Sequence, residues 1–335
     1  MAATRSSMAT IGIPRRRPTE VVVRVKACAL NGVDMLLLDG RFPPPEGLPH
    51  VNGCEVAGTV ETLGAAAKGV SVGQRVIVFP GFSCGTCEFC LRGERTLCLR
   101  YGYLGAHKDG GYAERVKVLA GSCLPLHDSV SFEAGAALPL AFLTSWHALL
   151  VKAELKPGQT VLVQAAGSGI GSAAIQIARL IGARVADDRR QRRQRSSSPK
   201  RSAPSGSSTT APRTSSKRRR SGRTSAGWTS SSSTSAARRS SDRPTRSPRL
   251  GTLVSIGSHD THWGRLDLRH VYSKNLRILG TNLGSILELR TLLEYVVDGR
   301  LKPVIDRAFP LADARHAVQH VLDRKNKGKV LLVPR

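Results

Sequence analysis

The sequence has few aromatic residues, few acidic residues and no long apolar run. Aromatic residues make up 4% of its 335 positions, and nowhere do 18 apolar residues follow one another. A helix needs about 20 such residues to cross a bilayer, so the sequence predicts no membrane span. Residues 1–18 contain four arginines but no acid and no apolar core typical of a secretory leader. We therefore expect a cytoplasmic protein.

The shortage of acidic residues is concentrated in one segment. The chain has 51 Lys and Arg against 24 Asp and Glu, a net charge of +27. Residues 186–249 alone hold 18 Lys and Arg and 3 Asp and Glu, a net charge of +15. A flexible nucleic-acid-binding arm is one interpretation of this segment. It lacks the interleaved aromatic residues that stack on bases, so nucleic acid is not the partner we expect.

Four of the seven cysteines lie close together in the chain. They are Cys84, Cys87, Cys90 and Cys98. Thiolates at this spacing suit tetrahedral Zn²⁺, and four protein ligands leave no open position for chemistry. Free thiols or disulfides are the alternative, but nothing else in the sequence points to an oxidising compartment. We therefore predict a structural zinc loop over 84–98.

Short strands and turns are predicted on both sides of this loop. Residues 21–25, 53–60 and 73–78 are apolar runs separated by glycine, which is typical of a small, irregular β domain. Residues 131–151 then have the pattern of a helix, and a buried strand is predicted at 160–164.

A glycine-rich turn follows the strand at 160–164. The apolar spacing of Ala173, Ile177, Ala178 and Ile181 predicts a helix directly after it. Strand, glycine turn and helix together open a dinucleotide-binding unit, in which backbone N–H groups approach a pyrophosphate. A turn made only for close packing is the alternative. The candidate cofactor residues of the turn are Ala166, Gly167, Ser168, Gly169, Ile170 and Gly171.

Three motifs together resemble the medium-chain dehydrogenase/reductase superfamily, in its zinc-containing alcohol dehydrogenase and quinone oxidoreductase-like branch. They are the cysteine loop, the glycine turn and the Gly-x-Leu-Lys-Pro-Val run at 299–304. The resemblance implies an α/β protein with a GroES-like β domain and a Rossmann domain built on a doubly wound parallel sheet. The GroES-like domain would comprise 19–130 and 300–335, and the Rossmann domain 131–299. Residues 1–18 remain unassigned.

The catalytic metal site of zinc alcohol dehydrogenases is not matched. Where the family has Cys, His and Cys ligands, this chain has Asn31, Cys54 and Leu140. The resemblance therefore implies a structural zinc but no catalytic zinc, as in quinone and enone reductases. The candidate catalytic residues, on turns beside the cleft, are Asn31, Asp34, Cys54 and Glu55. A weak metal site of Cys54, Glu55 and His50 is an open alternative.

The same branch implies hydride transfer between NADP(H), preferred over NAD(H), and a small carbonyl, enone or quinone. Thr144 and Gly257 match further positions at the cofactor. A homodimer or homotetramer is usual for the family. Two other interpretations remain open: nucleic-acid binding through the basic segment, and a scaffold that keeps its zinc loop but has lost the cofactor site.

The segment 186–249 has the length of the missing part of the Rossmann domain but not its composition. It has no apolar periodicity and contains runs such as Arg218-Arg219-Arg220 and Ser231-Ser232-Ser233. If GC-rich codons are assumed for this segment, reading them from the third base of each codon gives stretches that resemble the family's sequence there. We interpret the segment as the product of a shifted reading frame. The strands at 160–164 and 251–256 should then lack the strand that normally lies between them, which would leave their backbone groups unpaired. We therefore expect the chain with this sequence to fold poorly and to be inactive.

Overall fold

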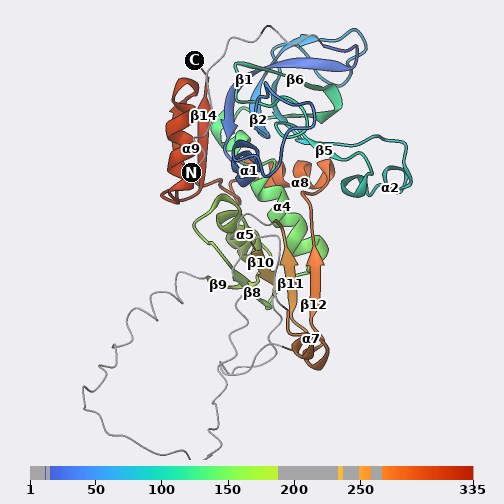
Figure 1. Ribbon diagram of the computed structural model, residues 1–335, viewed down its shortest axis with the longest axis vertical. Helices are drawn as coiled ribbons and strands as arrows, with labels where there is room; N and C mark the ends of the chain where they lie inside the picture. Colours follow the sequence, from blue (N-terminus) through green and yellow to red (C-terminus); the bar gives the residue numbers. More distant parts are fainter. Residues whose placement is uncertain (1–11, 13–15, 188–232, 237–248, 258–265, 335) are drawn as a thin grey trace, which may run out of the picture.

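The computed structural model describes residues 12, 16–187, 233–236, 249–257 and 266–334. Most of the basic segment and most of residues 1–18 lie outside this part of the chain. Two sheets lie one after the other along the long axis of the molecule, and helices lie between them (Figure 1). None of the described helices combines the length and apolarity that a membrane span requires.

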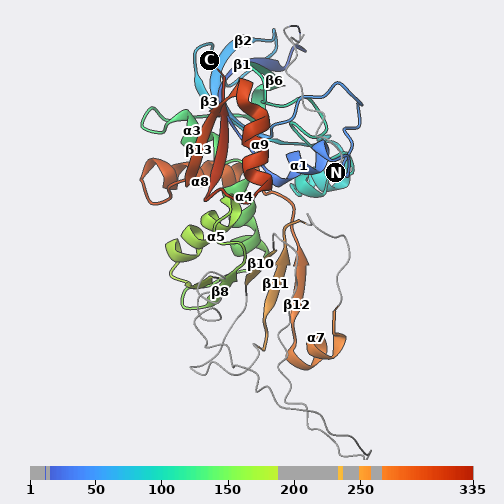
Figure 2. The same ribbon diagram turned by 60° about the vertical axis from the view of Figure 1, so that its left-hand side comes forward.

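The first sheet joins the first and last strands of the described chain. Its strand order is β13-β14-β1-β2-β3-β7, and β6 also pairs with β1. The strands are β1 (Glu20–Ala29), β2 (Glu55–Leu63), β3 (Arg75–Val78), β6 (Arg115–Leu119), β7 (Cys123–Pro125), β13 (Ile305–Pro310) and β14 (Lys329–Val333). Strand β1 is buried over most of its length because valines and small residues fill it. Helix α9 (Ala314–Leu322) stands beside β13 and β14 (Figure 2).

A small lobe projects from this sheet (Figure 1). It begins and ends in an antiparallel pair, β4 (Gly81–Phe82) and β5 (Gly102–Tyr103). Between them lie a short helix, α2 (Glu88–Leu91), and a 3-10 helix, Arg95–Leu97. A further short helix, α1 (Gly32–Leu38), follows β1 directly.

The second sheet has the order β12-β11-β10-β8-β9. Its strands are β8 (Thr160–Val163), β9 (Arg184–Asp187), β10 (Ser233–Ala236), β11 (Thr252–Ser255) and β12 (Arg277–Gly280). Three helices follow these strands: α5 (Gly169–Leu180), α7 (Leu268–Lys274) and α8 (Ile286–Val297). Pairs β8–β9 and β11–β12 are parallel, as in a Rossmann domain.

Strand β10 differs from the sequence-based expectation. It lies between β8 and β11 and pairs with both, so the prediction that these strands would have no common partner is wrong. It runs antiparallel to both neighbours, whereas a doubly wound sheet has a parallel strand there. Serine and threonine replace the β-branched apolar residues typical of such a central strand.

The predicted helix 131–151 is divided into three pieces. Helix α3 (Phe132–Ala136) ends before Pro139, α4 (Ala141–Trp146) begins after it, and a π-helical segment, His147–Lys152, continues α4. Proline lacks the N–H that a continuous helix requires and clashes with the preceding turn. The break lets α4 pack between the two sheets, where Phe142 and Leu143 join Ile77 of β3 and Val161 of β8 in one core.

Candidate active site and metal centre

A cluster of buried polar side chains lies where β1 ends and β2 begins. Asn31 immediately precedes α1, and Asp34 is in the first turn of that helix. The Asn31 backbone N–H donates to Asp34 Oδ2 over 2.7 Å, and the Asn31 amide donates to Glu55 Oε2 over 3.0 Å. The three side chains are almost fully buried, so the structure brings together three of the four predicted catalytic residues.

Glu55 connects the first sheet to helix α4. Its Oε1 accepts hydrogen bonds from the backbone N–H groups of Leu140, over 2.6 Å, and Ala141, over 3.0 Å. These N–H groups form the positive end of α4, where a carboxylate is favoured by the helix dipole. Leu140 therefore serves this site through its backbone, although its side chain cannot bind a metal.

Lys329, at the start of β14, completes the cluster and was not among the predicted residues. Its ammonium group lies 2.5 Å from Glu55 Oε2, 2.6 Å from Asn31 Oδ1 and 2.8 Å from Leu30 O. An ammonium has three donors, and all three are used. The sequence does contain a signal, since Lys329 comes directly before the apolar run 330–333, but only the strand pairing of β14 with β1 brings it to Glu55.

The hydrogen bonds assign different roles to the four predicted catalytic residues. Asn31 uses both amide hydrogens and its oxygen, since it also donates to Ala29 O, and Glu55 accepts four bonds. Both amide hydrogens of Asn31 and both carboxylate oxygens of Glu55 are therefore bound within the protein, and these contacts join β1, β2, α4 and β14. Asp34 differs, because Tyr112 donates to its Oδ2 over 2.7 Å while its buried Oδ1 has no partner.

Burial controls the protonation of Asp34 and Cys54. Desolvation raises the pKa of Asp34 to about 6, although hydrogen bonds from Tyr112 and Asn31 oppose the shift. Desolvation, with the nearby Asp34 charge, raises the pKa of the Cys54 thiol well above its ordinary value. Cys54 is therefore a neutral thiol at physiological pH, and neutral thiols are poor metal ligands and nucleophiles.

The described residues give no support to the alternative metal site of Cys54, Glu55 and His50. The only group of residues there with the geometry of a metal site is the four-cysteine group described below. Glu55 is occupied by Lys329 and α4, and His50 Nε2 bonds Gly105 O over 3.1 Å.

The glycine turn lies between β8 and α5, as the sequence predicts. Ser168 caps α5 by accepting a hydrogen bond from Gly171 N over 3.0 Å. A Cβ atom at Gly171 would lie 2.2 Å from Ala165 O, so only glycine fits there. Lys329 packs against this turn, because a Cβ at Gly169 would meet its Cδ at 2.5 Å. The backbone of the turn is thus close to the polar cluster.

The other two predicted cofactor residues are Gly257, on the same sheet edge as the turn, and Thr144, in helix α4. Strands β8 and β11 are both antiparallel to β10, so their carboxyl ends share one edge of the sheet. The turn 166–171 follows β8, and Gly257 lies just beyond β11 at that edge. Thr144 is buried in α4, and its neighbour Ser145 donates to Ile170 O over 3.1 Å. Ligands of open α/β sheets bind at this edge.

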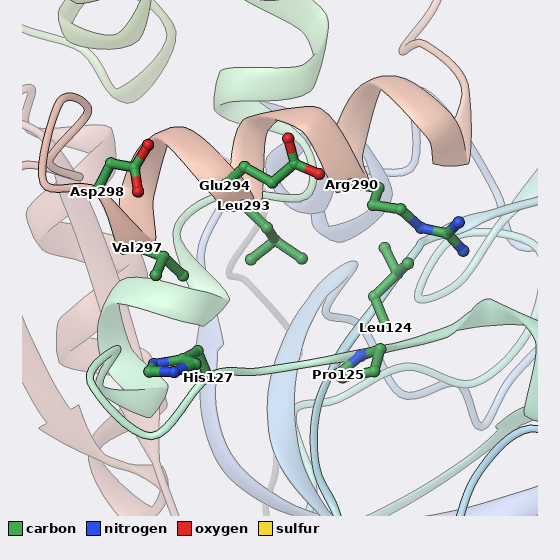
Figure 3. Close-up of a pocket in the computed structure, with 8 residues that line it drawn as sticks. All are labelled: Leu124, Pro125, His127, Arg290, Leu293, Glu294, Val297 and Asp298. Carbon is green, nitrogen blue, oxygen red and sulfur yellow. The ribbon is translucent and has the colours of Figure 1, made fainter.

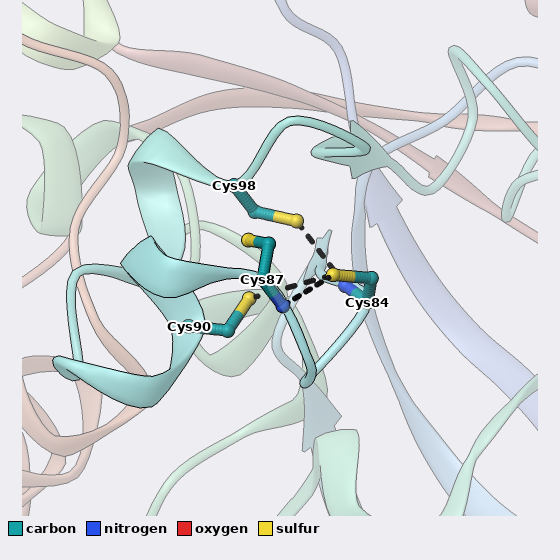
Figure 4. A group of neighbouring side chains, drawn as sticks. All are labelled: Cys84, Cys87, Cys90 and Cys98. Atoms are coloured by element: carbon teal, nitrogen blue, oxygen red, sulfur yellow. Dashed lines mark hydrogen bonds between the residues drawn. The ribbon is translucent and has the colours of Figure 1, made fainter.

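The four cysteines converge in the projecting lobe (Figure 4). Their sulfur atoms all lie within 4.8 Å of one another, and Cys84 Sγ is 3.9 Å from Cys90 Sγ. Zn–S bonds of about 2.3 Å place tetrahedral sulfurs about 3.8 Å apart. Backbone N–H groups of Thr86 and Cys87 lower the pKa of the Cys84 thiol to about 5, which favours the thiolate. The donor set fits a closed structural zinc site.

A separate cavity of about 420 Å³ lies between α8 and strand β7 with the segment that follows it (Figure 3). Leu124, Leu293 and Val297 are among its apolar lining residues. Glu294 of α8 and Asp298, directly after that helix, are among its charged ones. None of its lining residues belongs to the polar cluster or the glycine turn.

Two family models match the chain. Residues 17–128 match the alcohol dehydrogenase GroES-like domain, and residues 234–332 match the zinc-binding dehydrogenase domain. The alcohol dehydrogenase of Geobacillus stearothermophilus is 37% identical over 167 residues, which is 50% of this chain and 49% of that protein. The match thus spans about half of each protein.

Other similarities extend over nearly the whole chain. The acryloyl-coenzyme A reductase of Sulfurisphaera tokodaii is 28% identical over 324 residues, covering 96% of this chain and 94% of that protein. The crystal structure of an NAD-dependent alcohol dehydrogenase superposes with a TM-score of 0.75 at 31% identity, covering 97% of this chain and 94% of the other. With its GroES-like sheet, its Rossmann-type sheet and its cysteine lobe, the chain belongs to the medium-chain dehydrogenase/reductase superfamily of nicotinamide-dependent oxidoreductases.

Proposed function

We propose that this protein reduces a carbonyl compound conjugated to a C=C bond, an enone or a quinone, with NADPH and without a catalytic metal. The observation that carries the proposal is the ammonium of Lys329 bound between Asn31 and Glu55, beside the positions where metal-dependent relatives have their zinc ligands. A cation already balances the buried carboxylate there, so the site has no unpaired charge for a metal ion to neutralise.

The residues at the three ligand positions support this proposal. Cys54 is a buried neutral thiol, and the side chain of Leu140 has no atom that can bind a metal. Asn31 donates both of its amide hydrogens within the protein, and its oxygen accepts from Lys329. The similarity to acryloyl-coenzyme A reductases favours a substrate whose double bond is conjugated to a carbonyl, over a simple alcohol.

The chain's own groups would bind and orient the reactants. The N-terminus of α5, with the backbone of 167–171, is suited to the pyrophosphate of a dinucleotide. Glu55 of β2 and Lys329 of β14 pair with each other, and Glu55 holds the start of α4 against the first sheet, which would keep Thr144 beside the turn. The bound nicotinamide cofactor supplies the hydride, and the protein supplies orientation and exclusion of water.

The test is an absorbance assay at the wavelength of reduced nicotinamide, with NADPH or NADH and a panel of enones, quinones and aldehydes. We expect enones or quinones with NADPH to be the preferred pair, and metal analysis to find one zinc per chain. Two zinc ions per chain, with alcohol oxidation that a chelator abolishes, would contradict the proposal.

The location and assembly of the protein belong to this proposal as well. We expect a cytoplasmic homodimer or homotetramer, as is usual for the family. Light scattering of the purified protein would measure its mass, and a monomer of 35.9 kDa would contradict the expected assembly.

A further inference from the structure

A histidine surrounded by aromatic rings lies beside the candidate active site. The His107 ring centroid is 5.3 Å from that of Phe42, 5.9 Å from that of Tyr103 and 6.3 Å from that of Phe82. All four side chains are half-buried, so together they form an aromatic surface that a ligand can reach. Planar conjugated molecules bind well to such surfaces.

The loop that carries His107 is attached to the segment leading into Cys54 and Glu55. Gly110 N donates to Val51 O over 2.7 Å, and Gly111 N donates to Gly53 O over 2.9 Å. The same loop ends at Tyr112, which donates to Asp34. The aromatic surface and the polar cluster are therefore held together by one stretch of backbone.

The hydrogen bonds of His107 determine which ring nitrogen carries its proton. The Tyr103 backbone N–H donates to His107 Nδ1 over 3.1 Å, so Nδ1 is the unprotonated nitrogen and Nε2 carries the hydrogen. Within the described chain Nε2 has no hydrogen-bond partner. The half-buried imidazole thus presents one N–H donor to a ligand.

The surrounding groups keep the imidazole neutral. Burial, and then the neighbouring His50, lower the pKa of His107 below its ordinary value of 6.5. The Lys108 ammonium lies 4.4 Å from the centre of the Phe82 ring, which adds positive charge on the same side. The nearby carboxylate of Asp109 faces His50 at 3.6 Å.

We propose that His107 is a catalytic residue whose neutral Nε2–H donates a hydrogen bond to the carbonyl oxygen of the substrate, held against Phe42, Phe82 and Tyr103. This inference rests on the proposed function, because a carbonyl reductase without a catalytic metal needs another electrophile at that oxygen. A neutral imidazole can polarise a carbonyl in this way.

The chemical step balances without a further reactant. As the β-carbon of an enone, or the carbonyl carbon, gains the hydride, the π electrons move to the carbonyl oxygen. The Nε2–H group stabilises this negative charge by hydrogen bonding and keeps its proton. Water then protonates the product, at the oxygen or at the α-carbon, and leaves hydroxide in solution.

The first test compares three substitutions. His107→Phe keeps the aromatic packing but removes the donor, and it should lower kcat about 100- to 1000-fold, the usual effect of losing one oxyanion donor. His107→Gln keeps an N–H donor and should recover part of that loss. His127→Phe, on an exposed loop away from the cluster, is the matched control and should leave kcat unchanged. Melting temperature and zinc content check that each variant is folded.

The pH profile separates a neutral donor from a proton donor. We expect the pH dependence of kcat between pH 7 and 9 to have the same shape in the wild type and in His107→Gln. The wild type should show no additional ionisation in this range. If such an ionisation were found, His107 would act as an acid and the inference would be wrong.

A second readout needs no turnover. The absorption band of 4-dimethylaminocinnamaldehyde moves to longer wavelength when its carbonyl is polarised, and it can be bound together with the oxidised cofactor. The shift should appear in the wild type and in His107→Gln and be absent in His107→Phe. An equal shift in all three proteins, or none in the wild type, would overturn the role of His107. A normal shift in a wild type that reduces no enone would support that role and refute the proposed NADPH reduction.

Discussion

At the residue scale, the candidate active site depends on Lys329. Lys329 and Glu55 are 4% and 0% exposed, so each charge is stable in the core only because the other is present. Their contact also connects β14 to the start of β2, and through Glu55 to α4. One side chain near the end of the chain therefore positions residues from three distant parts of the sequence.

Replacing Lys329 with methionine should destabilise the protein by about 3–5 kcal/mol, because the substitution leaves the Glu55 charge buried and unpaired. Adding Glu55→Gln should restore part of that loss. Urea denaturation of the two single variants and the double variant measures the coupling. Lys325→Met is the control, since Lys325 is exposed and its pair with Asp323 should contribute little. If the loss of stability in the double variant equals the sum of the losses in the two single variants, Lys329 and Glu55 do not stabilise each other.

Asp34 should make the free energy of unfolding fall as pH rises, the opposite of the effect of a salt-bridged carboxylate. Burial raises its pKa from 3.8 to about 6, so the folded state holds a proton that the unfolded chain releases between these values. Stability from this group is full below about pH 4 and falls as pH rises to about 6, by roughly 3 kcal/mol. Asp34→Asn should remove this slope. Denaturation of both proteins from pH 4 to 7 gives the difference, and parallel curves would show that Asp34 is not perturbed.

At the scale of elements, the cysteine lobe has little apolar core of its own. Leu91, Leu97 and Leu99 are all largely exposed, so metal bonds must supply much of its order. Removing zinc with a chelator should make residues 84–98 sensitive to protease while the two sheets stay folded. Cys98→Ala should act in the same way, whereas Cys123→Ala should retain zinc. Limited proteolysis followed by mass spectrometry locates the cuts, and an intact zinc-free lobe would disprove the structural role.

At the scale of the whole molecule, the second sheet depends on its central strand. β10 joins β8 to β11, but it comes from the basic segment and runs antiparallel to both. Neither family match covers residues 129–233, and the zinc-binding dehydrogenase match resumes at 234, inside that segment. These observations support our proposal that much of 186–249 reflects a shifted reading frame.

The nucleotide sequence across codons 180–255 tests this proposal, and compensating single-base insertions or deletions are the expected result. We further expect the protein translated in the restored frame to melt cooperatively and to bind NADPH. The 335-residue chain with its present sequence should aggregate, or melt at a lower temperature, and it should not bind NADPH. If the chain with its present sequence is stable and active, its second sheet supports folding and cofactor binding without a change of reading frame.

Much of the architecture could be predicted from local patterns. The glycine-punctuated apolar runs correspond to β1, β2 and β3, and the spacing of Ala173, Ile177 and Ala178 corresponds to the buried face of α5. The pattern of 131–151 predicts helix in the right place, but Pro139 divides it, because proline cannot continue a helix from the preceding turn. Lys329 was missed because nothing local distinguishes a lysine that pairs with a buried carboxylate from one at the surface.

Neighbours along the chain are enough to predict the four-cysteine loop and the strand–turn–helix at 160–181, and to show that Asn31 and Leu140 stand where zinc-dependent relatives have ligands. Contacts between distant segments are needed to show that Glu55 caps α4 and that the Lys329 ammonium lies between Asn31 and Glu55. The same is true of the aromatic rings that surround His107. The physical reason is that hydrogen bonding and burial are set by groups distant in sequence, and their partners are defined only when the sheets close around them.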